Sequence, residues 1–227
     1  MSKIPEISNS NKPPKIVNES EVVGNHKGLL SCCSFFGSEH QILTAGSDCD
    51  LILWDVESGS ELSKLSGHDG TVLNFSVSPT DMCRLVASSS IDKSVRIWDM
   101  RSNKTVQIFD QHDYNVNCVE FLRTGESIIS GSDDAKCRFF DLRSDKLIGV
   151  YQKNSVLFGV NDLDVSSSGR ILFSGHHDGT INVWDTLKFC RLQITYGHDE
   201  RISCLKTSPD GLALATSSWD STIKVWS

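Results

Sequence analysis

Short apolar runs separated by polar turns recur along most of the chain, always in the same order. Each unit has an apolar run, a polar turn that contains an aspartate, and a second apolar run that closes on an aromatic residue. The five units span residues 42–55, 85–99, 127–141, 171–185 and 212–227. Short runs rich in Val, Ile, Leu and Phe between Gly, Ser, Asp and Asn predict β-strands. The pattern therefore predicts a repeat protein made of strands.

The period of these units is long, because their turn aspartates recur every 42 or 44 residues: Asp48, Asp92, Asp134, Asp178 and Asp220. A period of about 40 to 45 residues, with Gly-His early and Trp-Asp late, is typical of a propeller blade of four antiparallel strands. In the second unit, Gly67-His68 opens the blade and strands are expected at residues 72–77, 84–88, 95–98 and 105–109. The predicted fold is an all-β propeller of the WD40 type with five recognisable blades.

The propeller domain is expected to cover residues 19–227, with repeats that end near residues 55, 99, 141, 185 and 227. Residues 1–18 carry Pro5, Pro13, Pro14 and several Ser and Asn, which is the composition of a disordered lead. This start lacks the apolar core of a signal peptide, and no run in the chain approaches the roughly 20 apolar residues of a membrane span. We expect a cytoplasmic protein without direct membrane insertion.

The composition of the chain limits the kinds of partner and metal site that we expect. With 38% hydrophobic residues, 22% charged residues and a net charge of −7, the chain has no general affinity for nucleic acid. Among its eight cysteines, Cys33, Cys118, Cys137 and Cys204 lie inside strand patterns, and there is no CxxC pair. These four are expected to be buried small apolar side chains, not disulfides or zinc ligands.

Further polar positions recur at fixed offsets from the turn aspartate. A histidine opens four of the five units, a Ser or Thr lies four residues before the aspartate, and an aromatic residue lies six after it. Such a set predicts a buried chain of hydrogen bonds that fixes strand register. The predicted structural network comprises His26, Thr44, Asp48, Trp54, His68, Ser88, Asp92, Trp98, His112, Ser130, Asp134, Ser174, Asp178, Trp184, His198, Thr216, Asp220 and Trp226.

Two units depart from this network. The third has Phe140 in place of an indole donor, and the fourth has no histidine between Tyr151 and Gly159, so Ser174 and Asp178 need another partner or water. The third and fourth blades are therefore expected to be the less stable ones.

The same residue types also describe catalytic or metal sites. A catalytic Ser/His/Asp set is unique and lines a cleft, whereas this one appears four times, and there is no GxSxG elbow. His176, His177 and Asp178 stand side by side, but adjacent turn residues point in different directions, which favours a solvent-facing loop over a metal site. The chain is predicted to be non-enzymatic, without a metal or cofactor.

Trp219 occupies the turn immediately before Asp220, where the other units have Ser47, Ile91, Asp133 and His177. A tryptophan on an exposed turn is typical of an anchor in a protein interface. The alternative is that its ring folds back onto the neighbouring blade.

Several runs resemble the G protein beta subunit: residues 29–35, 52–59, 130–146 and 197–226. Residues 98–102, 150–159 and 168–175 are similar to the divergent fifth class of that family. Its members bind a gamma subunit or, in the fifth class, the gamma-like domain of a regulator of G protein signalling. One propeller face binds the alpha subunit and effectors. The resemblance implies a signalling scaffold in the cytoplasm that reaches the inner face of the plasma membrane through its partners.

The resemblance also implies partner-binding residues. Asn117, Asp133, Arg201 and Trp219 match the family's partner face, and Leu73 is a close replacement. Leu29, Thr71 and Asn115 stand where a tyrosine and two aspartates are usual, which predicts weaker binding of the alpha subunit. A generic WD40 adaptor outside G protein signalling is the alternative function.

The largest departure from the family is at the start of the chain. The family has seven blades and an N-terminal helix that pairs with gamma as a coiled coil, but this chain has five units and no heptad pattern before them. Either five blades close into a ring or the chain is a truncated, even non-functional, product. The last unit stops after its third strand. Residues 18–23 are expected either to supply its outer strand or to stay beside the first unit, leaving two unpaired edges.

Overall fold

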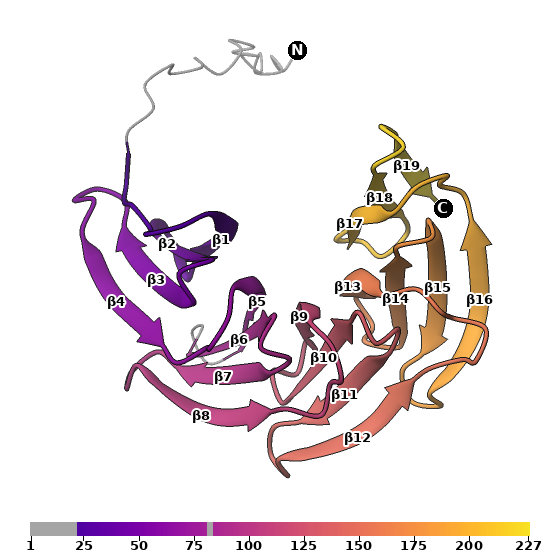
Figure 1. Ribbon diagram of the computed structural model, residues 1–227, viewed down its shortest axis with the longest axis horizontal. Helices are drawn as coiled ribbons and strands as arrows, with labels where there is room; N and C mark the ends of the chain where they lie inside the picture. The colour runs from indigo at the N-terminus through magenta and orange to yellow at the C-terminus, as the bar shows by residue number, and fades with distance from the viewer. Residues whose placement is uncertain (1–21, 81–83) are drawn as a thin grey trace, which may run out of the picture.

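The computed structural model describes residues 22–80 and 84–227, which form nineteen strands in five antiparallel sheets. No α-helix occurs among these residues. Each sheet is one blade, and Figure 1 shows the first strand of each blade innermost and, in the four-stranded blades, the fourth outermost. The all-β propeller architecture with five blades that the period predicts is confirmed.

The blades follow one another along the chain with nearly equal strands. Blade 1 contains β1 (Leu30–Phe36), β2 (Ser38–Gly46), β3 (Asp50–Asp55) and β4 (Glu61–Ser66). Blade 2 contains β5 (Val72–Val77), β6 (Leu85–Ser90), β7 (Val95–Asp99) and β8 (Lys104–Phe109). Blade 3 contains β9 (Val116–Phe121), β10 (Ser127–Ser132), β11 (Cys137–Asp141) and β12 (Lys146–Tyr151). Blade 4 contains β13 (Val160–Val165), β14 (Ile171–His176), β15 (Thr180–Asp185) and β16 (Cys190–Tyr196), and blade 5 contains β17 (Ile202–Thr207), β18 (Leu214–Ser218) and β19 (Ile223–Trp226).

The hydrophobic core lies between neighbouring blades, because a four-stranded sheet has two faces and each must be covered. Between blades 1 and 2, Leu51 and Leu65 of the first sheet pack in one cluster with Val72, Phe75 and Trp98 of the second. Equivalent clusters join blades 2 and 3, blades 3 and 4, and blades 4 and 5. Each blade is therefore stabilised mainly by its neighbours.

The five blades form an open arc and do not close into a ring, as Figure 1 shows, so of the two alternatives the self-closed ring of five blades is not the one observed. Blade 5 has three strands, and within the described residues no strand pairs with the outer edge of β19. Of the run expected to supply that strand, Val22 and Val23 are not in a strand and Val23 lies beside blade 1, where its carbonyl faces Gly59. Residues 18–21 and the lead expected at 1–18 lie outside the described residues.

The expectation of four buried cysteines is wrong for two of them. Cys118 and Cys137 are buried between blades 3 and 4, but Cys33 and Cys204 are exposed. Cys33 belongs to the first strand of the arc and Cys204 to the first strand of its last blade, where no further blade covers the outward-facing side of the sheet. Strand patterning predicts that a side chain faces a sheet surface, but not whether another blade covers that surface.

Candidate functional site

The recurring aspartate lies in the turn between the second and third strands of each blade. The residue after it adopts a left-handed conformation, at Cys49 (φ 68°), Lys93 (71°), Ala135 (61°), Gly179 (76°) and Ser221 (66°). In blades 2 to 5, the aspartate Oδ1 accepts the backbone N–H two residues on, which is the local bond that makes Asp favourable in turns. In blades 2, 3 and 5 the second carboxylate oxygen, Oδ2, faces the interior and contacts the histidine that opens the blade.

Blade 2 shows how the recurring polar residues connect. Trp98 Nε1 donates to Ser88 Oγ at 2.8 Å, and Ser88 Oγ lies 2.7 Å from His68 Nε2. His68 Nδ1 lies 2.8 Å from Asp92 Oδ2. Because an indole only donates and a carboxylate only accepts, the bonds run in one direction from tryptophan to serine, histidine and aspartate. This relay joins the third strand, the second strand, the blade opening and the turn.

Blades 1 and 5 contain the same relay. In blade 1 it connects Trp54, Thr44, His26 and Asp48 at 2.8, 2.6 and 2.9 Å. In blade 5 it connects Trp226, Thr216, His198 and Asp220 at 2.9, 2.8 and 2.8 Å. Burial acts to raise the pKa of Asp92 in blade 2, but hydrogen bonds from His68 and Ser94 outweigh it, so the pKa is lowered. These hydrogen bonds thus stabilise the charged form of the Asp92 carboxylate, which accepts the last bond of the relay.

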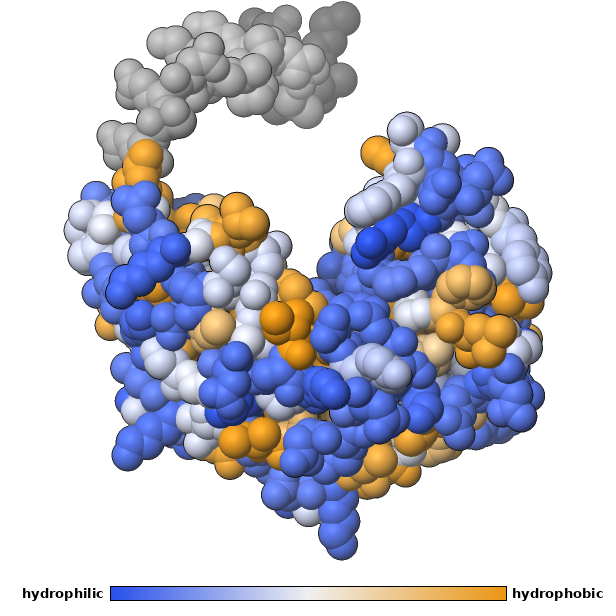
Figure 2. Space-filling view, in the orientation of Figure 1, coloured by the Kyte–Doolittle hydropathy of each residue, from blue (hydrophilic) through white to orange (hydrophobic). Residues whose placement is uncertain are grey.

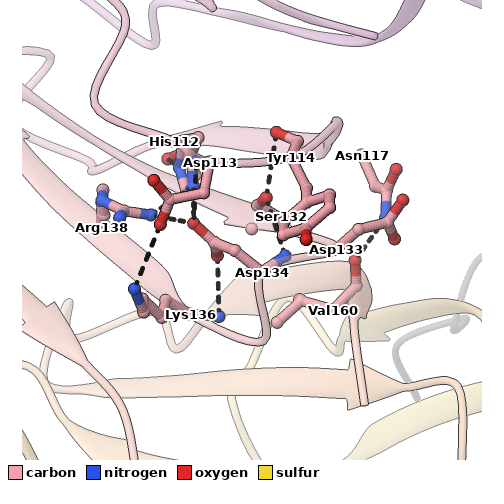
Figure 3. A network of polar contacts seen from close by, with 12 residues as sticks. His112, Asp113, Tyr114, Asn117, Ser132, Asp133, Asp134, Lys136, Arg138 and Val160 are labelled. Atoms are coloured by element: carbon pink, nitrogen blue, oxygen red, sulfur yellow. Dashed lines mark hydrogen bonds and ion pairs between the residues drawn. The ribbon is translucent and has the colours of Figure 1, made fainter. Parts of the chain in front are cut away.

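Blade 3 lacks the indole donor but keeps the rest of the relay. Ser130 Oγ lies 2.7 Å from His112 Nε2, and His112 Nδ1 lies 3.0 Å from Asp134 Oδ2. Figure 3 shows the guanidinium of Arg138 beside this histidine and aspartate, and it forms an ion pair with Asp134. The arginine therefore compensates at the aspartate end for the missing donor at Phe140.

In blade 4 the hydrogen-bond relay follows a different route from that in the other blades. Trp184 Nε1 donates to Ser174 Oγ at 2.9 Å, and the next partner is His176, whose Nε2 lies 3.0 Å from that oxygen. His176 Nδ1 donates to the backbone carbonyl of Phe158 at 2.9 Å, so Asp178 lies off the relay. His176 is 1% exposed, and the expectation that it belongs to a solvent-facing loop is wrong. Burial lowers its pKa, which keeps the imidazole neutral at neutral pH.

The expected partner-binding residues all lie at one end of the blades, which we call the turn face. It is built from three repeated positions in each blade. The first lies just before the inner strand (Leu29, Thr71, Asn115, Gly159, Arg201), the second inside its start (Ser31, Leu73, Asn117, Asn161, Ser203), and the third just before the turn aspartate (Ser47, Ile91, Asp133, His177, Trp219). In every blade the third position donates its backbone N–H to the carbonyl of the first, at 2.8–3.1 Å.

The second position is a β-bulge in all five blades, because the register shifts there each time. The bulge turns its side chain toward the next blade. Ser31 Oγ donates to the carbonyl of Val72, Asn117 Nδ2 to that of Val160 at 2.8 Å, and Asn161 Nδ2 to that of Ile202. Leu73 has no donor, so this bond is absent between blades 2 and 3.

A continuous chain of polar contacts crosses the turn face over blades 3 to 5. Asn117 Nδ2 donates to Asp133 Oδ1 at 2.6 Å, and this oxygen lies 3.6 Å from His177 Nε2. Asn161 Oδ1 accepts from both His177 Nε2 at 2.7 Å and Arg201 Nη2 at 2.8 Å. Figure 3 shows the blade 3 end of this chain, where Asn117 and Asp133 lie apart from the buried relay.

Trp219 ends this chain in blade 5. The guanidinium of Arg201 lies 4.4 Å from the centre of its ring, which is a cation–π contact. The ring remains 65% exposed, so it has not folded back onto a neighbouring blade. The geometry therefore brings four of the five expected residues into one connected surface, while Leu73 stands apart in blade 2.

Two members of the chain of contacts, Asn161 and His177, were missed by sequence reasoning. Asn161 occupies the same repeat position as Leu73 and Asn117, and His177 the same position as Asp133 and Trp219. Alignment of the repeats by their turn aspartates would have found both. Burial and the nearby charge of Arg201 lower the pKa of His177, and the acceptor Asn161 Oδ1 requires that its Nε2 carry the proton.

A second group of titratable side chains lies along the inner wall of the arc, where a cavity of about 260 Å³ is lined by Glu120, Asp164 and Lys206. Lys206 Nζ lies 3.7 Å from Glu120 and 3.5 Å from Asp164. Burial raises the pKa of Glu120 to about 7. Among the described residues, no group of three His, Cys, Asp or Glu side chains is arranged to hold a metal ion.

Comparison with known proteins decides the family. The family model described as G protein beta WD-40 repeat protein matches residues 3–227. This chain belongs to that family. It is 42% identical over 215 residues to guanine nucleotide-binding protein subunit beta-5b of Danio rerio, which covers 95% of this chain and 54% of that protein.

Two further relatives carry the name of a guanine nucleotide-binding protein beta subunit. Guanine nucleotide-binding protein subunit beta-2 of Caenorhabditis elegans is 45% identical over 174 residues, or 77% of this chain and 47% of that protein. The beta subunit of Oryza sativa subsp. indica is 35% identical over 224 residues, or 91% of this chain and 58% of that protein. The chain thus spans about half the length of the curated relatives it matches. The part of it that the structure describes contains no helix long and apolar enough to cross a membrane.

Proposed function

We propose that this chain is a non-enzymatic beta-type signalling scaffold whose turn face binds subunits of G proteins. The observation that carries the proposal is the chain of contacts from Asn117 to Trp219, which ends in an exposed tryptophan stacked on an arginine. Tryptophan and arginine are the residue types that most often dominate binding energy in protein interfaces.

The stacking supports binding because it orders the anchor before a partner arrives. Arg201 is fixed by its bond to Asn161, and the ring of Trp219 rests on the fixed guanidinium. An anchor that is already held in one conformation loses less side-chain entropy on binding. The half-buried Asp133 and Asn117 add polar groups of defined orientation beside it.

The relatives' names supply the class of partner, since each is a subunit of a guanine nucleotide-binding protein. We assign the G protein alpha subunit and effectors to the turn face, and a gamma subunit or the gamma-like domain of a regulator of G protein signalling to a separate surface. With these partners, we expect the protein in the cytoplasm and at the inner face of the plasma membrane. Leu29, Thr71 and Asn115 carry no charge, which predicts weaker alpha-subunit binding than an acidic surface gives.

The experiment measures affinity of the full chain for an alpha subunit, with and without a co-expressed gamma-like domain. Trp219→Ala is expected to weaken binding by about 30-fold, the effect of losing an interface hot spot of about 2 kcal/mol. Leu212→Ala is the matched control, because Leu212 is 76% exposed in the β17–β18 turn at the opposite end of the same blade. Equal affinities for Trp219→Ala and the control contradict the assignment of the turn face.

A generic adaptor role is the second candidate, favoured by the apolar exposure of Leu29, which is 82%. In that case Trp219→Ala leaves binding of G protein subunits unchanged and abolishes binding of another protein. Parallel measurement of both interactions separates the two functions.

A further inference from the structure

The polar contacts of the turn face extend one residue further in blade 3. Asn115 Nδ2 donates to Asp133 Oδ2 at 3.2 Å, so both carboxylate oxygens of Asp133 accept a bond from an asparagine. Tyr114 directly precedes Asn115, and its backbone carbonyl accepts a bond from Ser132 Oγ at 3.3 Å, as Figure 3 shows. Its ring is 62% exposed. The backbone of Tyr114 is therefore held in place while its ring is accessible.

This ring forms a second contact between an exposed aromatic residue and a cation. Lys93 Nζ of blade 2 lies 5.9 Å from the centre of the Tyr114 ring, within the range of a cation–π contact. Arg201 and Trp219 make the same kind of contact in blade 5. The polar contacts that cross blades 3 to 5 thus have an exposed aromatic ring with a cation at each end. Figure 2 gives the hydropathy of one face of the molecule for comparison.

The fold requires neither Lys93 nor Tyr114. Lys93 has a left-handed backbone with φ 71°, which is unfavourable for a residue with a Cβ atom. The equivalent of Tyr114 in blade 2 is Gly70, where a Cβ atom would lie only 2.6 Å from Ile91 Cγ1, so the repeat forms without an aromatic ring there. The equivalents of Lys93 in the other blades carry no charge: Cys49, Ala135, Gly179 and Ser221.

The charge of Lys93 is not matched by a carboxylate. Its ammonium group forms no ion pair within residues 22–80 and 84–227. Asp92, the preceding residue, is held by the histidine of its relay. Asp113 lies 3.4 Å from Lys136, and Asp133 is bonded to two asparagines. An exposed cation without a partner in its own chain is complementary to an acidic group on another protein.

We propose that the G protein partner of the turn face makes a second contact at Tyr114 and Lys93. In this contact an apolar side chain of the partner stacks on the Tyr114 ring, and an Asp or Glu carboxylate of the same segment pairs with Lys93. The proposal rests on the proposed function, because the same partner contacts Trp219.

The chemistry of the two side chains supports this assignment. Tyrosine offers a large, rigid contact area and loses little conformational entropy on binding. Ile91, two residues before Lys93, is 41% exposed and adds apolar surface in the same turn. Thr71 and Asn115, the first turn-face positions of blades 2 and 3, carry no charge that would repel an acidic segment.

The test measures the affinity of the full chain for a G protein alpha subunit at two ionic strengths. Tyr114→Ala is expected to raise the Kd about 10-fold. Lys93→Gln is expected to raise it about 3-fold, the effect of an exposed ion pair, and to make binding less sensitive to salt. Lys93→Arg should match wild type, because it keeps both the charge and the contact with the ring.

Lys104→Gln is the matched control for Lys93→Gln. Lys104 is exposed at the start of β8, at the opposite end of the same blade. Thermal denaturation checks that each variant folds as wild type does, which is expected because Tyr114 and Lys93 are exposed.

The outcomes separate this proposal from the proposed function. Wild-type affinity for Tyr114→Ala, with weak binding by Trp219→Ala, overturns the second contact and leaves the function of the turn face standing. Wild-type affinity for both variants contradicts the function itself. Equal affinities for Lys93→Gln and Lys104→Gln, with weak binding by Tyr114→Ala, overturn the pairing of Lys93 with a carboxylate.

Discussion

The turn face and the two end faces of the arc both expose large apolar side chains, but for different reasons. The end faces are the side of blade 1 that faces away from blade 2 and the side of blade 5 that faces away from blade 4. Trp219 is 65% exposed at a position where the equivalents in the other blades are also exposed or only half-buried. Ile223 is 78% exposed at a position where every equivalent is buried. Every blade leaves the turn-face position accessible, whereas the end faces are exposed because no neighbouring blade covers them among the described residues.

This difference separates two kinds of surface in a repeat protein. A position that is accessible in every repeat is suited to bind other proteins, since the fold never needs it covered. A position that is buried in every internal repeat is part of the stacking interface, and at an end of the array it behaves as an unpaired half of that interface. The predictions below test this distinction through stability and binding.

The largest effect is expected for the tryptophan of the relay. Trp98 is 1% exposed between blades 1 and 2, and Trp98→Ala should lower the free energy of unfolding by about 3–5 kcal/mol. Trp226 is only half-buried because blade 5 has three strands, and Trp226→Ala should cost about half as much. Urea denaturation followed by circular dichroism measures both. Equal losses would mean that the fourth strand of a blade does not set the burial energy of this tryptophan.

The second effect separates blades 2 and 3. Ser88→Ala leaves two buried groups without a partner, Trp98 Nε1 and His68 Nε2, and should cost about 2–4 kcal/mol. Ser130→Ala leaves only His112 Nε2 without a partner, because Phe140 has no donor. This variant should lower the free energy of unfolding by about 1–2 kcal/mol. Comparison of the two urea midpoints checks this order. A larger loss of stability for Ser130→Ala than for Ser88→Ala contradicts the hydrogen bonds described for the two blades.

The third prediction concerns pH. Burial raises the pKa of Glu120 to about 7 from its usual value near 4.5, so the folded state favours the protonated carboxyl. The unfolded chain therefore releases this proton first, and the site costs stability as pH rises from about 4.5 through about 7. Glu120→Gln removes that cost. The melting temperature of the variant relative to wild type should rise between pH 5 and pH 8, and a constant difference contradicts the assignment.

The smallest effects are expected for the exposed anchors. Trp219→Ala and Ile223→Ser should each change the free energy of unfolding by less than about 0.5 kcal/mol, because neither side chain is buried in the isolated chain. The internal equivalent Val95→Ser should cost several times more. Thermal denaturation of the three variants beside wild type makes this comparison. A large loss of stability for Ile223→Ser would indicate that another part of the protein covers this side chain.

The recurring residues made much of the blade predictable. Fixed offsets from the turn aspartate place His68, Ser88 and Trp98 around Asp92, and the observed bonds join these side chains because antiparallel pairing sets Ser88 on β6 beside β7, which carries Trp98. A hydrogen-bond relay within one blade depends on local register, which the repeat encodes. The strand ranges expected for blade 2 accordingly differ from the structure by one or two residues at a few ends.

Features that break the repeat or depend on neighbouring blades were not predictable in the same way. His176 enters the relay from two residues beyond Ser174, a route that no other blade uses. The bulge that turns Asn161 toward the next blade is a register shift without a residue type of its own. Cys33 and Cys204 follow the strand pattern, yet they are exposed because they belong to the end faces.

The two surfaces differ most in binding, since we propose that the turn face binds G protein subunits and that the end faces of the arc do not. Calorimetric titration of a G protein alpha subunit into wild type, Trp219→Ala and Val225→Lys tests this difference most directly, because Trp219 lies on the turn face and Val225 on the end face of blade 5. We predict that Trp219→Ala binds about 30-fold more weakly and that Val225→Lys matches wild type. Weaker binding by Val225→Lys together with unchanged binding by Trp219→Ala would contradict it.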